Sequence, residues 1–274
     1  MSTLQAIVLG IVQGLTEFLP VSSSGHLVIV PALLHWEQPG LAFVVAVHLG
    51  TLVAVLVYYW RDWWRLISAT GGWLVGGRRW PPPDDVGVVG LLLLGTVPAA
   101  AVGLLLADAI EKLFNDVALV AAGLIVTGLM LLLANARAHD HGASGRLSLT
   151  QALLVGFGQA VAIVPGISRS GTTISVGLLA GLQRDWAARF AFLLSVPVIA
   201  GAGAKEGLDL LEANITADQW LMLGYGLLAG AVSGLVAIHA VVRVVHTGRL
   251  WCFGIYCIAA GMLTLSALVL GLLR

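Results

Sequence analysis

Residues 13–26 read QGLTEFLPVSSSGH and interrupt a chain that otherwise consists of long apolar segments. They hold a carboxylate at Glu17, an imidazole at His26 and a run of three serines that follows Pro20. Proline and clustered serines break a helix, and such breaks survive at membrane depth only where protein or a water-filled cavity satisfies the backbone. Ionisable groups at that depth are costly and mark functional sites by default. The stretch therefore predicts a re-entrant helix hairpin over residues 4–34 with a site at its turn.

The composition around this stretch is that of a polytopic membrane protein. Hydrophobic residues make up 59% of the 274 residues, charged residues make up 10%, and the mean hydropathy is +0.97. A soluble protein carries about 25% charged residues. The formal net charge is zero, so nothing indicates a nucleic-acid partner. Cys252 and Cys257 lie five residues apart in one expected helix and are interpreted as core residues rather than as a disulfide or a metal site.

Apolar runs that are long enough to cross a bilayer predict six transmembrane helices. A second segment, residues 149–182, is broken near its middle by proline, glycine and serine, as residues 4–34 are. The predicted fold class is an all-α polytopic membrane protein, a single integral domain with six transmembrane helices plus two re-entrant helix hairpins. The expected spans are residues 41–60, 86–107, 117–137, 187–204, 220–242 and 251–272.

The placement of lysine and arginine predicts how these segments are oriented. Threading three spans, a hairpin and three more spans puts ten basic residues on one side and three on the other, with Arg169 set aside. The richer side is expected to be cytoplasmic, which places both termini outside. Residues 62–85 form the longest loop, and tryptophans near its start indicate a short interfacial helix. Residues 138–148 form a polar linker, whose His139-Asp140-His141 is interpreted as solvated rather than metal-binding.

The two broken segments are related by an internal repeat. Each half, residues 1–137 and 149–274, contains one hairpin and three spans, so the halves are expected to have opposite orientations. Such an inverted repeat places broken helices near the bilayer midplane, where helix N-termini can face an anion. Four residues recur 146 positions later, with Gln13, Ser22, Ser24 and Gly25 matching Gln159, Ser168, Ser170 and Gly171.

The repeat is chemically asymmetric, and this asymmetry predicts a phosphate site. Glu17 and His26 supply titratable groups that suit acid, base or metal-ligand roles. Arg169 offers a planar, permanently charged fork that matches phosphate oxygens. Glycines allow the backbone to approach a ligand, and N–H groups at the helix starts can hold its oxygens. The expected hydroxyl donors and glycines are Ser22, Ser23, Ser24, Gly25, Ser168, Ser170, Gly171, Thr172 and Thr173, beside the amides of Gln13 and Gln159.

Each of these residues also has an ordinary structural interpretation. Glu17 and Arg169 can form a structural buried ion pair, and His26 can be a satisfied interior histidine. His48 lies in an expected span, where a core role is favoured over lining a cavity. The convergence of an acid, an imidazole, an arginine and hydroxyls on two helix breaks favours a site over packing.

At these residues the chain resembles the bacterial undecaprenyl-diphosphate phosphatase family that is linked to bacitracin resistance. The matching motifs are the element from Gln13 to Glu17, the stretch PVSSSGH at residues 20–26 and the stretch PGISRSGTT at residues 165–173. The similarity runs nearly end to end. Where many relatives have glutamate this chain carries Gln13, which weakens the case for two carboxylates on a metal. Ser24 replaces a threonine of other members and keeps the hydroxyl.

The resemblance implies a phosphatase that hydrolyses undecaprenyl diphosphate to undecaprenyl phosphate and inorganic phosphate at the outer face of the bacterial cytoplasmic membrane. This reaction recycles the lipid carrier for cell-wall synthesis and confers bacitracin resistance. The resemblance also implies a divalent cation, Mg²⁺ or Ca²⁺, for which Glu17 and Gln13 are the candidate ligands. Ser23 is then the nucleophile or its neighbour, Glu17 and His26 supply base and metal roles, and Arg169 binds phosphate.

The expected partners are the polyprenyl diphosphate lipid and the bilayer, with a second copy of the chain in a homodimer as a further candidate. An alternative function from another class is a polyprenyl-phosphate transporter or flippase, because inverted repeats with broken helices are typical of transporters. A purely structural membrane subunit is disfavoured, because it leaves Glu17, His26 and Arg169 unexplained.

Overall fold

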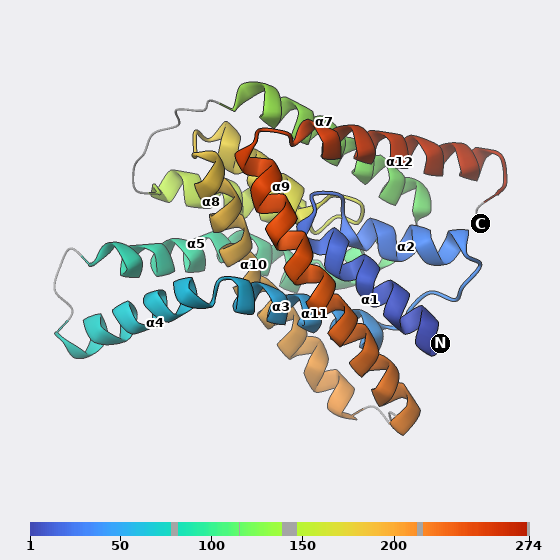
Figure 1. Cartoon of the computed structure of the whole chain (residues 1–274), viewed down its shortest axis with the longest axis horizontal. Coiled ribbons are helices and arrows are strands. Elements are labelled where there is room, and N and C mark those ends of the chain that lie inside the picture. Colours follow the sequence, from blue (N-terminus) through green and yellow to red (C-terminus); the bar gives the residue numbers. More distant parts are fainter. Residues whose placement is uncertain (78–81, 115, 139–146, 213–215, 273–274) are drawn as a thin grey trace.

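The computed structural model describes residues 1–77, 82–114, 116–138, 147–212 and 216–272. Within these ranges the chain forms helices and no strand, and the predicted polar linker motif at residues 139–141 lies outside them. In chain order the helices are α1 (Thr3–Phe18), α2 (Ser23–Leu33), α3 (Leu41–Tyr58), α4 (Trp60–Val75), α5 (Asp84–Leu105), α6 (Ala107–Leu113), α7 (Val117–Arg137), α8 (Leu149–Val161), α9 (Arg169–Leu179), α10 (Arg184–Glu212), α11 (Ala217–His246) and α12 (Trp251–Val269) (Figure 1).

Six of these helices are long and apolar enough to cross a membrane, which confirms the six expected spans. They are α3, α5, α7, α10, α11 and α12, with mean hydropathies between 1.6 and 2.6. The expected bounds of α10 and α11 were too short. A hydropathy window ends where polar residues begin, whereas helical hydrogen bonding continues until a cap ends it. The first residue of α11 is set by such a cap at Thr216, whose side chain accepts a hydrogen bond from the backbone N–H of Gln219 in a capping box.

The two interrupted segments form broken helix pairs, as the sequence predicts. α1 and α2 are separated by residues 19–22, and α8 and α9 by residues 162–168. Ser22 and Ser168 are the N-caps of the second helices, and each side-chain oxygen accepts from the N–H three residues later. Ser2 and Ser148, also 146 residues apart, start α1 and α8 with capping boxes. The local signals that shape each pair are therefore repeated, which is compatible with the predicted inverted repeat.

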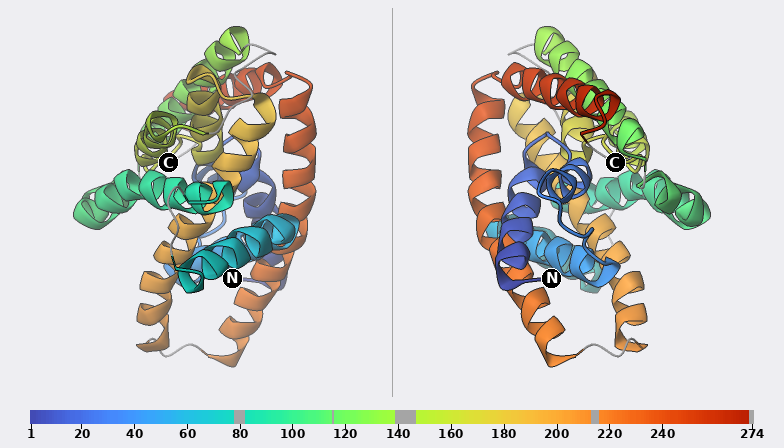
Figure 2. Two further views of the ribbon diagram at one scale, coloured as in Figure 1. Left: turned by 90° about the vertical axis from the view of Figure 1, so that its left-hand side faces the viewer. Right: turned by 90° about the vertical axis from the view of Figure 1, so that its right-hand side faces the viewer.

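The broken pairs are held inside the bundle by neighbouring helices. α1 packs against α11, which also packs against α3; α8 packs against α5, and α12 against α7. Figure 2 shows α11 as a long helix along one side of the molecule. The residues around the breaks, including Phe18, Val21, Val120 and Ile174, belong to the main hydrophobic core. The breaks therefore lie in the protein interior, where neighbouring groups can satisfy them.

Small residues allow this close packing, as they commonly do between membrane helices. On α1, Gly10 and Gly14 lie against the backbone of α11 at Gly226 and Gly230. On α8, Gly156 lies against the backbone of Gly95 in α5. A side chain at Gly14 would meet the hydroxyl of Ser233 and the carbonyl of Gly230 at distances that real side chains do not reach. The contact between α1 and α11 thus requires glycine, and it fixes the helix that carries Glu17.

We expect Gly14→Val to separate α1 from α11 and to destabilise the folded protein by about 1–3 kcal/mol, as overpacking does. Thermal unfolding of the purified protein in detergent should show a midpoint that is several degrees lower. Gly224→Val is the matched control, because Gly224 lies in α11 with nothing within 4 Å of an added Cβ. Equal midpoints for the two variants would contradict the close-packing interpretation.

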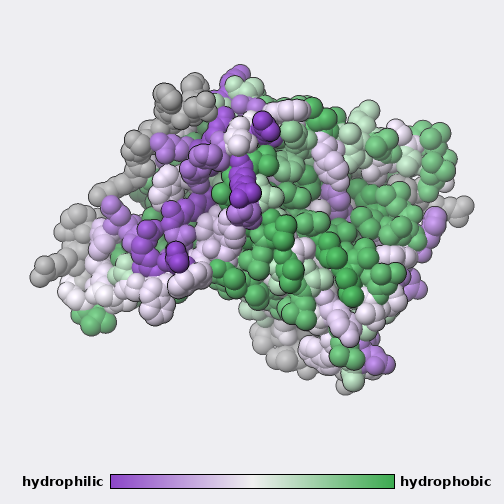
Figure 3. Space-filling view, viewed as in Figure 1, coloured by the Kyte–Doolittle hydropathy of each residue, from purple (hydrophilic) through white to green (hydrophobic). Residues whose placement is uncertain are grey.

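The polar surface gathers toward one end of the molecule, and a broad hydrophobic surface covers much of the rest of the visible face (Figure 3). Ion pairs connect three helices whose ends carry basic residues, because Arg189 of α10 contacts Asp62 of α4, and Arg65 contacts Asp85 of α5 at 3.2 Å. A helix is present where the sequence predicts one, as α4, whose buried residue is Leu66, and its interfacial position stays a prediction. The helix ends that the sequence assigns to the basic side therefore meet in space. The assignment of that side to the cytoplasm stays a prediction.

The two cysteines are free, as expected. Cys257 is buried in α12, and its thiol contacts the carbonyl oxygen of Pro20 at 3.5 Å. Cys252 is exposed at the start of the same helix, so the interpretation as a core residue was wrong for that position. Its place in the first turn of α12 leaves its side chain outside the packing between helices.

Candidate active site

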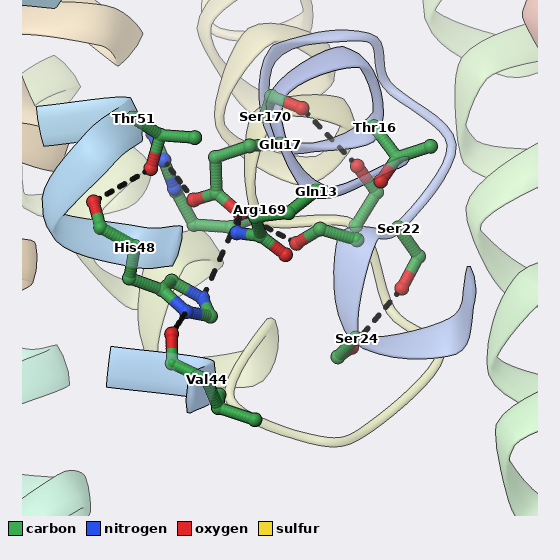
Figure 4. Close-up of polar contacts among 12 residues, drawn as sticks. Gln13, Thr16, Glu17, Ser22, Ser24, Val44, His48, Thr51, Arg169 and Ser170 are labelled. Carbon is green, nitrogen blue, oxygen red and sulfur yellow. Dashed lines mark hydrogen bonds and ion pairs between the residues drawn. The ribbon is translucent and has the colours of Figure 1, made fainter. Parts of the chain in front are cut away.

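Glu17 is the centre of a buried polar cluster in which three helix ends meet (Figure 4). One carboxylate oxygen lies 2.7 Å from a guanidinium nitrogen of Arg169. The other accepts hydrogen bonds from the hydroxyl of Ser23 at 2.5 Å and from the amide nitrogen of Gln13 at 2.8 Å. Only 7% of Glu17 is exposed. The carboxylate is therefore surrounded by donors and by one permanent positive charge.

The helix breaks create this arrangement. Glu17 lies in the last turn of α1, and Gln13 lies one turn earlier on the same face. Ser23 and Arg169 are the first residues of α2 and α9, respectively, so each side chain projects from the start of a helix. Residues 23 and 169 correspond in the internal repeat. The hydroxyl of Ser23 and the guanidinium of Arg169 thus come from equivalent positions of the repeat, and both bind the carboxylate of Glu17.

One guanidinium nitrogen of Arg169 makes no hydrogen bond to the described residues. Its NH2 contacts Glu17, whereas its NH1 is buried and has no hydrogen-bond partner among the described residues. Buried donors are normally paired, so an unpaired guanidinium nitrogen beside a bound carboxylate requires an explanation. The fork geometry of arginine allows one nitrogen to hold Glu17 while another binds a phosphate oxygen.

His48 belongs to this cluster, and the preference for a core role was wrong. Its Nε2 lies 3.8 Å from a carboxylate oxygen of Glu17. Its Nδ1 lies 2.8 Å from the carbonyl oxygen of Val44, one turn earlier in α3. A third of the side chain is exposed, so His48 is not a core residue. The sequence offered only the position of a histidine in an apolar span, which did not separate the two roles.

The serines of the two breaks bond to each other and across the breaks. Ser22 pairs with Ser24 at 3.2 Å, and Ser168 pairs with Ser170 at 3.2 Å. Ser170 donates to the carbonyl of Leu19 in the first break at 3.2 Å. The N–H of Gly166, in the second break, donates to Ser24 at 3.4 Å. The two breaks therefore form one hydrogen-bonded unit.

Ser22 has an unusual backbone conformation, with φ 70° and ψ 99°. A positive φ is disfavoured for a residue with a side chain, costs about 1–3 kcal/mol and is concentrated at functional sites. The equivalent Ser168 has φ −70°, so the strain is confined to the first break. Ser23 follows directly after this break, and its hydroxyl donates to Glu17.

Two helices outside the broken helix pairs contact them through polar side chains, and the sequence did not indicate either contact. Thr127 of α7 accepts from the backbone N–H of Ser168 at 2.9 Å. Tyr256 of α12 lies with its hydroxyl 2.7 Å from Nε2 of His26. The other ring nitrogen of His26 lies 2.8 Å from the carbonyl oxygen of Ser22. No pattern of spacing links residues 127 or 256 to the hairpins, so only the packing of helices reveals these contacts.

The remaining predicted residues are arranged more locally. Gly25 and Gly171 donate their N–H groups to the capping serines. Thr173 bonds back to the carbonyl of Arg169 within α9. Both polar atoms of the Gln159 side chain and the hydroxyl of Thr172 are buried without a hydrogen-bond partner among the described residues. Their binding roles stay predictions.

The chain is similar to known proteins over nearly its whole length. A family model described as "Bacitracin resistance protein BacA" matches residues 6–263. A relative from Thermomicrobium roseum is 43% identical, with 97% of this chain and 98% of the relative covered. One from Rubrobacter xylanophilus is 44% identical with the same coverage, and one from Desulforudis audaxviator is 42% identical over the full length of both. All three are named undecaprenyl-diphosphatase, and none of these names supports the transporter alternative.

Proposed function

Because this chain belongs to the family of the bacitracin resistance protein BacA, we propose that it is an undecaprenyl-diphosphatase and that Glu17 is the centre of its active site. It hydrolyses undecaprenyl diphosphate to undecaprenyl phosphate and inorganic phosphate, which returns the lipid carrier to cell-wall synthesis. One observation carries the assignment of the site: Glu17 holds both the hydroxyl of Ser23 and the guanidinium of Arg169. A base, a nucleophile and a phosphate-binding cation are therefore in contact.

The first chemical step uses these three residues. Ser23 Oγ attacks the terminal phosphorus, and its proton moves to the Glu17 carboxylate, to which it is already hydrogen-bonded at 2.5 Å. The bond from phosphorus to the bridging oxygen breaks, and undecaprenyl phosphate leaves with the electron pair. The free nitrogen of Arg169 and the helix starts stabilise the charge on the transferred phosphoryl oxygens.

The second step restores the enzyme. A water attacks the phosphoserine, and its proton goes to His26, which lies one helical turn after Ser23 on the same face of α2. Ser23 leaves with the proton that Glu17 received in the first step. Inorganic phosphate is released, and His26 returns its proton to solvent.

The residues around Glu17 suit a divalent cation. The side-chain oxygen of Gln13 is buried without a partner among the described residues, and it lies on the amide that contacts Glu17. Mg²⁺ and Ca²⁺ take oxygen ligands, and Mg²⁺ is commonly held by one or two carboxylates together with substrate phosphates. Glu17 and Gln13 would hold such an ion. When bound, it would supply positive charge to the diphosphate oxygens.

The orientation of the site follows from charge placement. We infer that the basic end of the bundle, where Arg65 and Arg189 form ion pairs, faces the cytoplasm. The termini and the entry of the first hairpin then face the outer side of a bacterial inner membrane. The polyprenyl tail of the substrate remains in the bilayer, and its diphosphate reaches Glu17 from the membrane.

The test is phosphate release from undecaprenyl diphosphate by purified protein with Mg²⁺ or Ca²⁺ present. In Ser23→Ala we expect kcat to fall by at least about 10³-fold, because no hydroxyl remains to attack and removal of a nucleophile costs a large part of the rate enhancement. Ser68→Ala is the matched control, because Ser68 is exposed on α4 and its hydroxyl donates to the carbonyl of Arg65 in the same helix. Full activity of Ser23→Ala would remove Ser23 from the mechanism and favour attack by water or by His26.

A further inference from the structure

His26 and Tyr256 form a bridge between the first broken pair and α12. The rings are nearly parallel, with an angle of 11° between their planes and centroids 5.8 Å apart. The Tyr256 hydroxyl lies 2.7 Å from Nε2 of His26, whose Nδ1 lies 2.8 Å from the carbonyl oxygen of Ser22. Both nitrogens of His26 are therefore engaged, one by the strained turn and one by a residue 230 positions away.

These contacts determine where the proton of the imidazole lies. A carbonyl oxygen only accepts hydrogen bonds, so Nδ1 of His26 carries the hydrogen that binds Ser22. In the neutral ring Nε2 then has a lone pair, and the hydroxyl of Tyr256 must be the donor. The tautomer of His26 is thus fixed from both sides, with Nε2 as its basic nitrogen.

We propose that Tyr256 is the proton relay between the reacting water and His26. The proposal rests on the proposed function, in which His26 receives the proton of the water. Since Nε2 is engaged by the phenol, that proton reaches it through the hydroxyl group. The Tyr256 oxygen accepts the proton from water while its own proton moves to Nε2, so Tyr256 stays neutral and His26 becomes the cation. The imidazolium then donates to the carbonyl of Ser22 and to the oxygen of Tyr256. The Tyr256 hydroxyl can take this role because a hydroxyl both donates and accepts hydrogen bonds.

The position of Tyr256 is fixed by its neighbours rather than by this hydrogen bond. The thiol of the adjacent Cys257 is buried against the carbonyl of Pro20, and Gly254 packs against α7 at Gly128. Tyr256 itself is 47% exposed, so removal of its single hydroxyl oxygen opens no cavity in the core. Loss of the hydroxyl should therefore affect proton transfer and leave the fold intact.

The first arm of the test compares Tyr256→Phe with the wild type in phosphate release from undecaprenyl diphosphate. We expect kcat to fall about tenfold or more, the effect of about one hydrogen bond in the transition state, with KM changed by less than about twofold. Tyr225→Phe is the matched control, because Tyr225 is a similarly exposed tyrosine on another helix, α11. A wild-type kcat, a rise in KM alone, or a loss of thermal stability that matches the loss of activity would each overturn the relay.

The second arm does not depend on activity. In protein labelled with ¹⁵N-histidine and reconstituted in lipid, the His26 signals are assigned by their loss in His26→Gln. In Tyr256→Phe we expect the Nε2 resonance to move toward that of an imidazole nitrogen that accepts no hydrogen bond, with Nδ1 still protonated. An unchanged Nε2 resonance would overturn the proposal. A wild-type protein that releases no phosphate would instead refute the proposed function, and the resonance would still report on the Tyr256–His26 bond.

Discussion

Glu17→Gln is expected to lower kcat for phosphate release by at least about 10³-fold, because glutamine keeps the shape of the side chain but accepts no proton from Ser23. The substitution also leaves Arg169 buried without its negative partner, which costs about 3–5 kcal/mol for a broken buried pair. Glu37→Gln is the matched control, because Glu37 is exposed in the segment between α2 and α3. Kinetics and thermal unfolding of both purified variants provide the measurement.

A double variant separates catalysis from structure. If Glu17 and Arg169 formed only a structural ion pair, neutral replacement of both would restore stability and also activity. We expect Glu17→Gln combined with Arg169→Gln to unfold at a higher temperature than Glu17→Gln alone and to remain inactive. Activity that returned together with stability would refute the catalytic role of the pair.

Arg169→Lys is expected to lower kcat/KM by about 10²–10³-fold, although the positive charge is kept. In the structure NH2 of Arg169 holds Glu17, and the buried NH1 is free for a phosphate oxygen. An ammonium group is a single point charge, so it cannot maintain both contacts in the same geometry. We expect kcat to fall and KM to rise, because Arg169 binds the diphosphate both before and during phosphoryl transfer.

The same change at another arginine controls for the loss of a guanidinium. Arg189→Lys alters a partly exposed arginine of α10 that pairs with Asp62 of α4. We expect wild-type turnover from this variant. Wild-type turnover from Arg169→Lys as well would contradict the role of Arg169 in binding phosphate.

The helix breaks and the spans were predictable because their causes act over a few residues. Pro20 and the serines after it end one helix and cap the next, and the same signals recur 146 residues later at Ser168. Hydropathy located the six spans for the same reason, and it missed the ends of α10 and α11, where polar residues continue a helix until a cap. The repeat also indicated that residues 17 and 169 belong to one site.

The individual contacts were decided by the packing of helices. Glu17 and Arg169 are 152 residues apart, and His26 and Tyr256 are 230 apart. Which side chain meets which at such separations depends on the register between helices, set here by close glycine contacts such as those of Gly14. The packing of helices therefore places His48 beside Glu17 and places the hydroxyl of Tyr256 within hydrogen-bond distance of His26.

The sequence by itself thus determined where the chain breaks, which segments are apolar enough to cross a membrane and which chemical groups gather at the breaks. Only the tertiary structure decided that Glu17 binds Ser23 and Arg169 together, and that α3 and α12 contribute His48 and Tyr256. The physical reason is that helix breaking and hydropathy are local properties, whereas a hydrogen bond between distant residues requires that several packed helices place both partners within about 3 Å.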